Sequence, residues 1–303
     1  MASMIILDLM GGVALLLWGL HMVRTGIIRA FGSNLRRLLA VALRNRGSAF
    51  LAGMGVTAVL QSSTATGLMV TSFVAGGLVD MVLALAIMLG ANVGTTLIVQ
   101  VLSYNVSAVA PVLFVLGLVA FNRGRRTWIR DMGRVSIGLG LMLLALHTLL
   151  DTLAPAEDAP LARALFESIT DQPILRVLMA AILTWAAHSS AAIVLIVMSL
   201  AYSHFITVSA GFALVLGANL GSAINPVVEG GTSNNPATLR LPIGNLINRI
   251  VGIALVLPFL GPVADMFSQV QPDPTRATAD FHTAFNLALA AAFIFVLDPL
   301  AYC

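Results

Sequence analysis

Two short polar motifs interrupt otherwise apolar stretches of the chain, and each motif occurs twice. The first reads Gln-Ser-Ser-Thr at residues 61–64 and returns as His-Ser-Ser-Ala at residues 188–191. Hydroxyl and amide groups donate hydrogen bonds to anions, and helix N-termini add free backbone N–H groups. This motif therefore indicates an anion site. Its candidate ligands are Gln61, Ser62, Ser63, Thr64, Ser189 and Ser190.

The second motif is Gly-Ala-Asn-x-Gly followed by hydroxyl residues, at 90–96 and again at 217–222. Its neutral oxygens are of the kind that hold Na+ where transporter helices are unwound. We therefore expect a broken helix at each of these places. Together with the side chains of the first motif, the candidate Na+ ligands are Gln61, Asn92, Thr95, Thr96, His188, Asn219 and Ser222.

Neither pair of motifs contains an Arg, Asp or Glu residue. A bound multivalent anion would thus be poorly compensated, and co-bound cations would have to supply the missing charge. The motifs therefore favour cotransport of an anion with Na+. Such transport would couple to the membrane potential, at about 2.3 kcal/mol per net charge per 100 mV.

Composition places these motifs in a membrane protein. Hydrophobic residues make up 59% of the 303-residue chain and charged residues 10%, against about 25% charged in soluble domains. Strict alternation of apolar and polar residues is absent, so the spans are predicted to be α-helices. The net charge of +3 comes from Arg clusters between apolar segments. These clusters mark cytoplasmic loops and not a nucleic-acid surface.

The motifs recur at a fixed offset, because Ser62 and Ser189, like Asn92 and Asn219, are 127 residues apart. The sequence therefore predicts two copies of one unit. Residues 1–134 form the first, with a hairpin tip at 61–66 and a broken helix at 90–96. Residues 135–260 form the second, with a tip at 188–191 and a broken helix at 217–222. Residues 261–303 are predicted to add an external loop and a final transmembrane helix.

Topology follows from the lengths of the apolar segments. The arms of 49–79 on either side of the first tip are shorter than the ~20 residues that a membrane-spanning helix needs. A re-entrant hairpin fits them better, and the two hairpins would then enter from opposite faces. Inverted repeats of this kind are typical of secondary transporters. We expect a multi-pass protein of the inner (plasma) membrane, with its C-terminus in the cytoplasm.

Other interpretations of the same residues were weighed. Small and hydroxyl residues also help membrane helices to pack, which explains scattered residues but not two clusters repeated at one spacing. A serine beside a histidine could belong to an intramembrane hydrolase. However, His188 directly precedes Ser189, which is poor geometry for a base, and no Gly-x-Ser-x-Gly motif occurs. We therefore expect a transporter and not an enzyme, and a channel or structural protein is a further alternative.

The two motifs and the late Phe-His-Thr-Ala-Phe-Asn run at 281–286 resemble the type II sodium/phosphate cotransporter family in its bacterial branch. The resemblance covers roughly residues 11–299 and implies import of inorganic phosphate with Na+ as the co-transported ion. It implies that residues 61–64 bind substrate and Na+. The residues it places beside them are Asn92, Thr95, Thr96, Ser189, Ser190, Asn219 and Ser222.

The chain departs from the family pattern at His188, where a second Gln is usual. An imidazole changes its charge near neutral pH, so transport of another anion, or H+ coupling through His188, is the alternative function. Arg249, about two turns into its span, is expected to snorkel or to pair. The expected partners are inorganic phosphate, sodium ions and the lipid bilayer, with no nucleic acid, and a homodimer is left open.

Overall fold

The computed structural model describes residues 2–41, 44–104, 109–153, 172–230 and 237–301, and the regular elements in these ranges are all helices. The predicted all-α fold is thereby confirmed. In chain order the elements are α1 (Ala2–Val41), α2 (Arg46–Leu60), α3 (Ser63–Ala75), α4 (Met81–Leu102), α5 (Val109–Arg123), α6 (Thr127–Leu153), α8 (Pro173–Ala187), α9 (Ser190–Tyr202), α10 (Val208–Gly230), α11 (Ala237–Val256), the short 3-10 helix η2 (Leu257–Phe259), α12 (Leu260–Val270), α13 (Pro274–Phe293) and α14 (Leu297–Ala301).

Length and hydropathy support several membrane crossings. Within the described ranges, five helical segments are long and apolar enough to cross a bilayer. They are Leu7–Leu39, Met81–Leu102, Thr127–Thr152, Val208–Gly230 and Thr238–Val270. Helices α2, α3, α5, α8 and α9 are apolar but shorter, with 13 to 15 residues each. The chain therefore has the features of a multi-pass membrane protein, and re-entry of the short helices stays a prediction.

The helix bounds repeat with the offset seen in the motifs. Helices α2 and α8 both have 15 residues, α3 and α9 both have 13, and each pair is displaced by 127 residues. Helix α4 corresponds in the same way to α10, which begins 127 residues later at Val208. Packing repeats as well, because α2 lies against α4 and α8 lies against α10. The two units are alike in element length and in contacts, whereas their inverted orientation stays a prediction.

The predicted breaks in α4 and α10 are wrong. Both helices are continuous, through 90–96 in α4 and through 217–222 in α10. The glycines serve close packing instead: a Cβ on Gly90 would overlap the carbonyl oxygen of Phe50 in α2, and a Cβ on Gly217 that of Val177 in α8. Gly-Asn clusters suit a tight helix crossing as well as an unwound segment, and the crossing is what forms here.

The external loop expected after residue 260 is largely helical. Helix α12 follows η2 directly and occupies Leu260–Val270, and α13 already begins at Pro274. Prolines in this stretch suggested a loop. Pro262 and Pro274 lie in the first turns of α12 and α13, where a backbone N–H has no helical acceptor and its absence costs little. Only Gln271–Asp273 separates the two helices.

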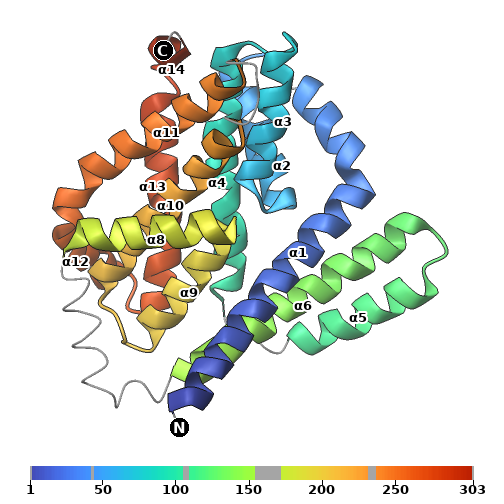
Figure 1. Ribbon diagram of the computed structural model, residues 1–303, viewed down its shortest axis with the longest axis vertical. Coiled ribbons are helices and arrows are strands. Elements are labelled where there is room, and N and C mark those ends of the chain that lie inside the picture. Colours follow the sequence, from blue (N-terminus) through green and yellow to red (C-terminus); the bar gives the residue numbers. More distant parts are fainter. Residues whose placement is uncertain (1, 42–43, 105–108, 154–171, 231–236, 302–303) are drawn as a thin grey trace.

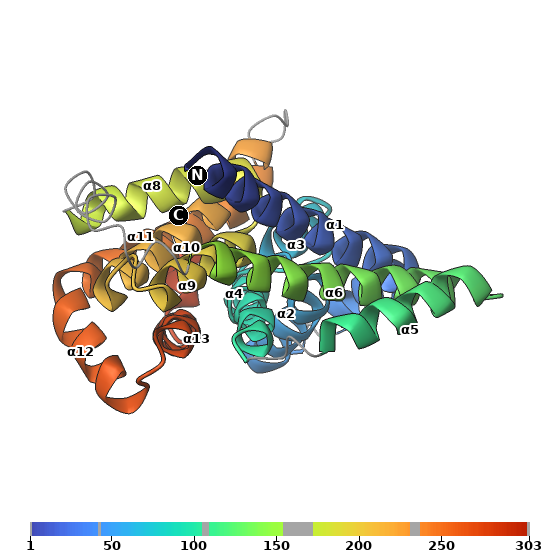
Figure 2. The same ribbon diagram turned by 90° about the horizontal axis from the view of Figure 1, so that it is seen from below.

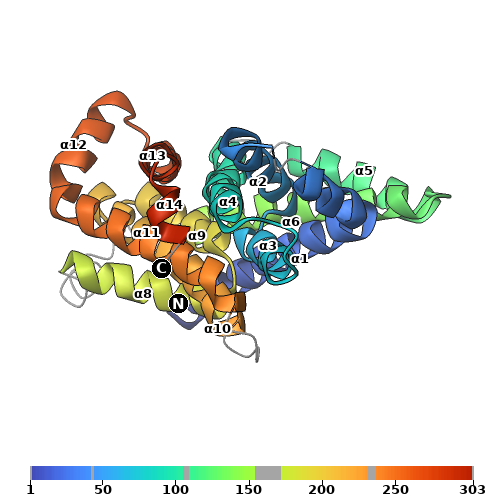
Figure 3. The ribbon, with the colours of Figure 1, turned by 90° about the horizontal axis from the view of Figure 1, so that it is seen from above.

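Three groups of helices make up the molecule (Figure 1). Helices α1 and α6 lie side by side and, with α5 beside α6, form a layer that extends away from the rest (Figure 2). Helices α2, α3 and α4 are central, next to the group formed by α8–α11 and α13. Helix α12 lies at the edge opposite α5 (Figure 3). Both hairpins therefore belong to the helical body outside the α1/α6/α5 layer.

Candidate functional site

Both hairpins turn through the same backbone conformation. Gln61 ends α2 with φ 54° and ψ 30°, and His188 ends α8 with φ 50° and ψ 28°. The following serines are extended, with φ −152° and ψ 103° at Ser62 and φ −153° and ψ 107° at Ser189. A non-glycine residue in the left-handed region costs on the order of 1–3 kcal/mol. Glycine would avoid that cost, so the repeated use of a polar side chain there points to a function for it.

Each serine caps the helix that follows. The Ser62 Oγ accepts a hydrogen bond of 3.1 Å from the backbone N–H of Ala65, and the Ser189 Oγ accepts one of 3.1 Å from that of Ala192. Apart from the N–H that the serine caps, the first backbone N–H groups of α3 and α9 have no acceptor within their own helices. Helix N-termini with free N–H groups and neighbouring hydroxyls favour an anion. Both tips thus offer groups to which an anion could bond, and anion binding at them stays a prediction.

Burial distinguishes the two tips. Residues 61–64 are all buried, and the Gln61 Oε1 has no hydrogen-bond partner. At the second tip Ser190 is buried and Ser189 half-buried, whereas the His188 side chain is 58% exposed. The His188 Nδ1 lies 3.7 Å from the Glu229 Oε1 at the end of α10. The first tip is therefore enclosed and the second open.

The asparagines of the second motif bond to helices that the sequence did not connect with them. Asn92 Nδ2 donates to Asn245 Oδ1 of α11 at 2.8 Å, and Asn286 Nδ2 of α13 donates to Asn219 Oδ1 at 3.1 Å. Arg249 Nη1 donates to Asn286 Oδ1 at 2.6 Å. All of these side chains are buried. The two motifs are thus anchored, through amide side chains, to α11 and α13.

Sequence reasoning did not connect Arg249, Asn245 and Asn286 with the motif asparagines. Arg249 does not snorkel, since only 1% of it is exposed, and it bonds to an amide instead of a carboxylate. A signal was present: Asn245 and Asn248 lie four and one residues before Arg249, which gives an apolar span one polar face. Their partners in other helices could not be read from spacing.

The hydroxyls of the second motif are satisfied within their own helices. Thr95 donates to the Asn92 carbonyl oxygen at 2.7 Å, Thr96 to that of Val93 at 2.8 Å, and Ser222 to that of Asn219 at 2.8 Å. Because the hydroxyl protons are already donated, a Na+ ion at these groups would be coordinated by the lone pairs of the hydroxyl oxygens. Helix α10 also contains Pro226. Because proline lacks an N–H, the Ser222 carbonyl oxygen does not have the backbone donor that residue 226 would otherwise supply.

Helices from each tip reach the other half of the chain. Helix α3 contacts α10, and a Cβ on Gly67 of α3 would lie 3.9 Å from the Pro226 Cγ. Helix α9 correspondingly contacts α4. Among the hydrogen bonds found between described residues, none joins the two tips directly. The helix that follows each tip therefore contacts the motif-bearing helix of the other half.

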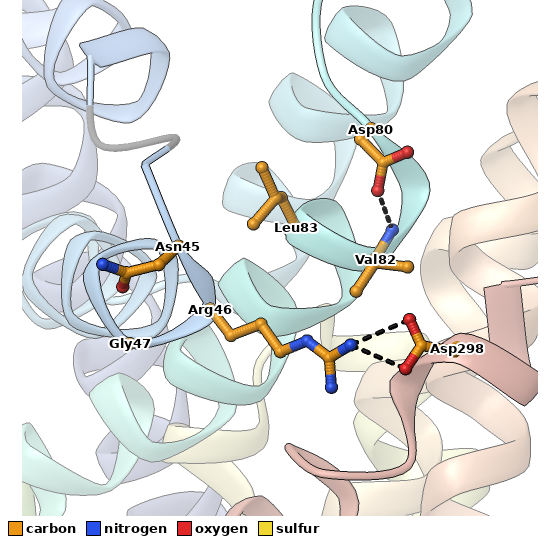
Figure 4. Close-up of a pocket in the computed structure, with 7 residues that line it drawn as sticks. All are labelled: Asn45, Arg46, Gly47, Asp80, Val82, Leu83 and Asp298. Carbon is orange, nitrogen blue, oxygen red and sulfur yellow. Dashed lines mark hydrogen bonds and ion pairs between the residues drawn. The ribbon is translucent and has the colours of Figure 1, made fainter.

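The surface hollow of Figure 4 lies elsewhere. It measures about 760 Å³ and is lined by Arg46, Asp80 and Asp298, among others. Arg46 bonds to both carboxylate oxygens of Asp298, at 2.8 and 2.6 Å, and to the Ile294 carbonyl oxygen at 3.1 Å. Arg46 begins α2 and Gln61 ends it, so the hollow and the tip are about 22 Å apart along the helix. This hollow is a junction between helix ends, separate from the motifs.

No group of three or more His, Cys, Asp or Glu side chains suited to a metal ion was found among the described residues. The fold and the two capped tips define a polytopic helical membrane protein with duplicated hairpins.

The sequence profile of the Na+/Pi-cotransporter family matches residues 15–151 and 155–289, one segment in each half of the chain. The chain belongs to this family, which confirms the resemblance found in its motifs. Family membership indicates a transporter.

Two relatives carry the printed name "Putative inorganic phosphate export protein YjbB". The Escherichia coli protein is 37% identical over 296 residues, which are 98% of this chain and 54% of that protein. The Salmonella typhimurium protein is 37% identical over 289 residues, 95% of this chain and 53% of that protein. The chain thus spans about half the length of these relatives.

A third relative is shorter. The uncharacterized protein YqeW of Bacillus subtilis is 28% identical over 276 residues, 91% of this chain and 89% of YqeW. No solved structure matches the chain significantly.

Proposed function

We propose that the protein is a secondary transporter that moves inorganic phosphate together with Na+ by alternating access. The observation that carries this proposal is the pair of tips with one backbone geometry, each with a capped helix N-terminus and serine hydroxyls. Phosphate accepts hydrogen bonds from such groups. The family to which the chain belongs, and the printed names of two relatives, support phosphate as the anion.

Sodium coupling rests on charge and on the family. The two hairpin tips carry no Arg, Asp or Glu, so a cation bound with the phosphate would reduce the cost of desolvating it. The Na+ ligands that we propose are the predicted side-chain oxygens together with the Ser222 carbonyl oxygen, which lacks the backbone donor of residue 226. Coupling through a proton is the alternative, and the exposed His188 beside Glu229 is the pair that would carry it.

The direction of phosphate transport depends on the ion gradients, because a secondary transporter can work in either direction and follows the net driving force. An inward Na+ gradient would drive phosphate import, which is the function that we propose first. Export is the second candidate, favoured by the names of the two relatives. Either direction would use the same hairpin tips, so the site assignment does not depend on this choice.

Proteoliposomes of the purified chain test the proposal. Radiolabelled phosphate should accumulate when an inward Na+ gradient is imposed, and should leave preloaded vesicles when the gradient is reversed. A K+ gradient of the same size is the control for the ion, and a pH gradient tests the proton alternative. Sealed vesicles that move no phosphate under any of these gradients would overturn the proposed function.

A further inference from the structure

Arg249 is a fully buried guanidinium with no acidic partner in the described part of the chain. It lies in α11, within a segment long and apolar enough to cross a membrane, and 1% of it is exposed. Its Nη1 donates to the Asn286 amide oxygen, and its Nε has no hydrogen-bond partner. Among the described residues no carboxylate oxygen lies within ion-pair distance of it. Arg249 is therefore a buried positive charge with no counter-ion among the residues that the structure describes.

Such a charge is costly, because a guanidinium loses its hydration on burial and gains too little from one amide. An apolar residue of similar volume would fill the same space without that loss. Ionisable residues within membrane-spanning segments commonly mark the pathway of a substrate or ion. The burial of Arg249 thus points to a ligand that brings negative charge to it.

The position of Arg249 connects it with the second motif of both halves. Asn286 accepts a hydrogen bond from the Arg249 guanidinium and donates one to Asn219, the asparagine of the second motif in the second half. Asn245, one helical turn before Arg249, accepts from Asn92, the equivalent asparagine in the first half. Residues from both halves therefore belong to one set of buried polar side chains around α11.

A second group near the Arg249–Asn286 bond has unused hydrogen-bonding capacity. His282, one turn before Asn286 on α13, is fully buried, and both of its ring nitrogens are without a partner. Its carbonyl oxygen accepts from the Asn286 Nδ2 at 2.8 Å. Unpartnered nitrogens on Arg249 and His282 leave this region with donors that the protein does not satisfy, as expected where a bound anion would satisfy them.

We propose that Arg249 is the fixed positive charge of the phosphate site, and that Asn286 and Asn219 position its guanidinium. This inference rests on the proposed function and adds a residue outside the motifs to it. A guanidinium matches phosphate oxygens in a two-pronged geometry that an ammonium cannot reproduce. One protein charge then offsets part of the charge of the anion, and co-bound Na+ has less to neutralise.

Transport kinetics of Arg249→Gln, Arg249→Lys and Arg249→Met test this role. The KM for phosphate should rise about 10-fold or more in the Gln and Met variants, as expected for the loss of one hydrogen bond to a charged group. The Lys variant should recover only part of the affinity. Arg125→Gln removes the same charge from an exposed position between α5 and α6 and is the matched control. Unchanged KM in folded Gln and Met variants would overturn the proposal.

Asn286→Asp is the second variant, chosen because it keeps the shape of the side chain and gives Arg249 a counter-ion. It gives up the hydrogen bonds that Asn286 Nδ2 donates to the Asn219 Oδ1 and the His282 carbonyl oxygen. It should remain folded and lose phosphate affinity, since the guanidinium is then neutralised within the protein. A purely structural Arg249 would predict the opposite, a stable protein with an unchanged KM. This variant decides the matter even if all three Arg249 variants fail to fold.

Phosphate binding to the protein in detergent distinguishes a failure of the proposed function from a failure of the proposed role of Arg249. Inorganic phosphate should raise the thermal-unfolding midpoint of the unaltered protein and not that of Asn286→Asp. If phosphate neither stabilises the unaltered protein nor crosses the membrane with it, the proposed function fails. If phosphate does both equally with Asn286→Asp, only the role of Arg249 fails.

Discussion

The two hairpin tips have the same backbone conformation but different surroundings. The φ and ψ angles of Gln61 and His188 agree within about four degrees, and the serine caps have the same length. Around this common turn, however, Gln61 is buried and His188 is exposed beside Glu229. The position that corresponds to Glu229 in the first half is Leu102. Duplication has thus kept the backbone geometry of the turn and changed what surrounds it.

A second difference lies inside the hairpins. Across the first, the Thr57 hydroxyl donates to the Thr66 Oγ1 at 2.8 Å, in a buried bond that ties its two arms together. In the second hairpin the same two positions are Thr184 and Ile193, and the Thr184 hydroxyl is buried without a partner. The first hairpin is therefore the more firmly connected of the two.

The largest expected effect comes from removing both hydroxyls of a tip. Ser62→Ala with Ser63→Ala, and Ser189→Ala with Ser190→Ala, should each lower phosphate transport by roughly 10²- to 10⁴-fold, because two hydrogen bonds to a charged ligand are worth about 1.5–3 kcal/mol each. Loss of the serine cap should cost both doubles a similar ~1 kcal/mol of stability. Uptake of radiolabelled phosphate at equal protein content is the measurement.

The exposed Ser72 of α3 provides the matched control, because Ser72→Ala removes a hydroxyl that bonds only to its own helix. If the second double variant transports normally and the first does not, the tips differ in role and not only in surroundings. Normal transport by both doubles would mean that the anion site lies elsewhere.

Packing of the motif-bearing helices gives the next largest effect. Gly90→Ala and Gly217→Ala should each destabilise the protein by about 1–3 kcal/mol, since the added methyl groups collide with backbone carbonyls of α2 and α8. Gly55→Ala in α2 is the control, because nothing lies within 4 Å of its added Cβ. It should stabilise by about 0.5–1 kcal/mol, the helix preference for Ala over Gly. Thermal unfolding in detergent measures all three.

Equal losses at Gly90 and Gly217 would show that the two helix crossings are equivalent in energy as well as in geometry. A Gly90→Ala protein as stable as Gly55→Ala would contradict the packing seen here and would return the glycines to the unwinding role expected from the sequence.

Local features were predictable from the sequence because they depend on neighbouring residues. The polar turns at 61–62 and 188–189, flanked by apolar arms too short to span, indicated where the hairpins bend. The offset of 127 residues indicated the equivalence of α2 with α8 and of α3 with α9. Composition was enough to predict the helical membrane class, since no other local structure satisfies the backbone in lipid.

Contacts between distant residues were not predictable in this way. The bond from Asn92 to Asn245 joins residues 153 positions apart, and Asn219 and Asn286 are 67 apart. Neither spacing nor composition indicates which helices meet. The prediction of helix breaks was wrong for a related reason. The sequence alone does not distinguish a glycine that permits unwinding from one that permits close packing of a neighbouring helix. Only the position of Phe50 and Val177 decides between these roles.

The hydroxyl bond of the first hairpin offers a smaller and more specific comparison. Thr57→Val removes the bond to Thr66 and should destabilise by about 0.5–1.5 kcal/mol, the usual net value of an intramolecular hydrogen bond. Thr184→Val replaces a buried hydroxyl that has no partner and should be neutral or stabilising. Thermal midpoints of the two variants give the comparison directly. Equal destabilisation by both would mean that Thr184 has a partner after all, and the hairpins would then be equally well connected.

The smallest effect is expected from converting the second tip to the residue of the first. His188→Gln places a side chain that the equivalent turn already accepts at φ 54°, so the backbone has no reason to change. If amide and imidazole serve alike as ligands, phosphate transport should stay within about 3-fold of the unaltered protein, because the exchange of one neutral hydrogen-bonding group for another costs well under 1 kcal/mol. Initial rates in proteoliposomes under a Na+ gradient and under a pH gradient decide the point. If the variant still transports phosphate under a Na+ gradient but no longer responds to a pH gradient, proton coupling would be assigned to His188 and Glu229. The exposure of the second tip would then be required for proton exchange with the solvent.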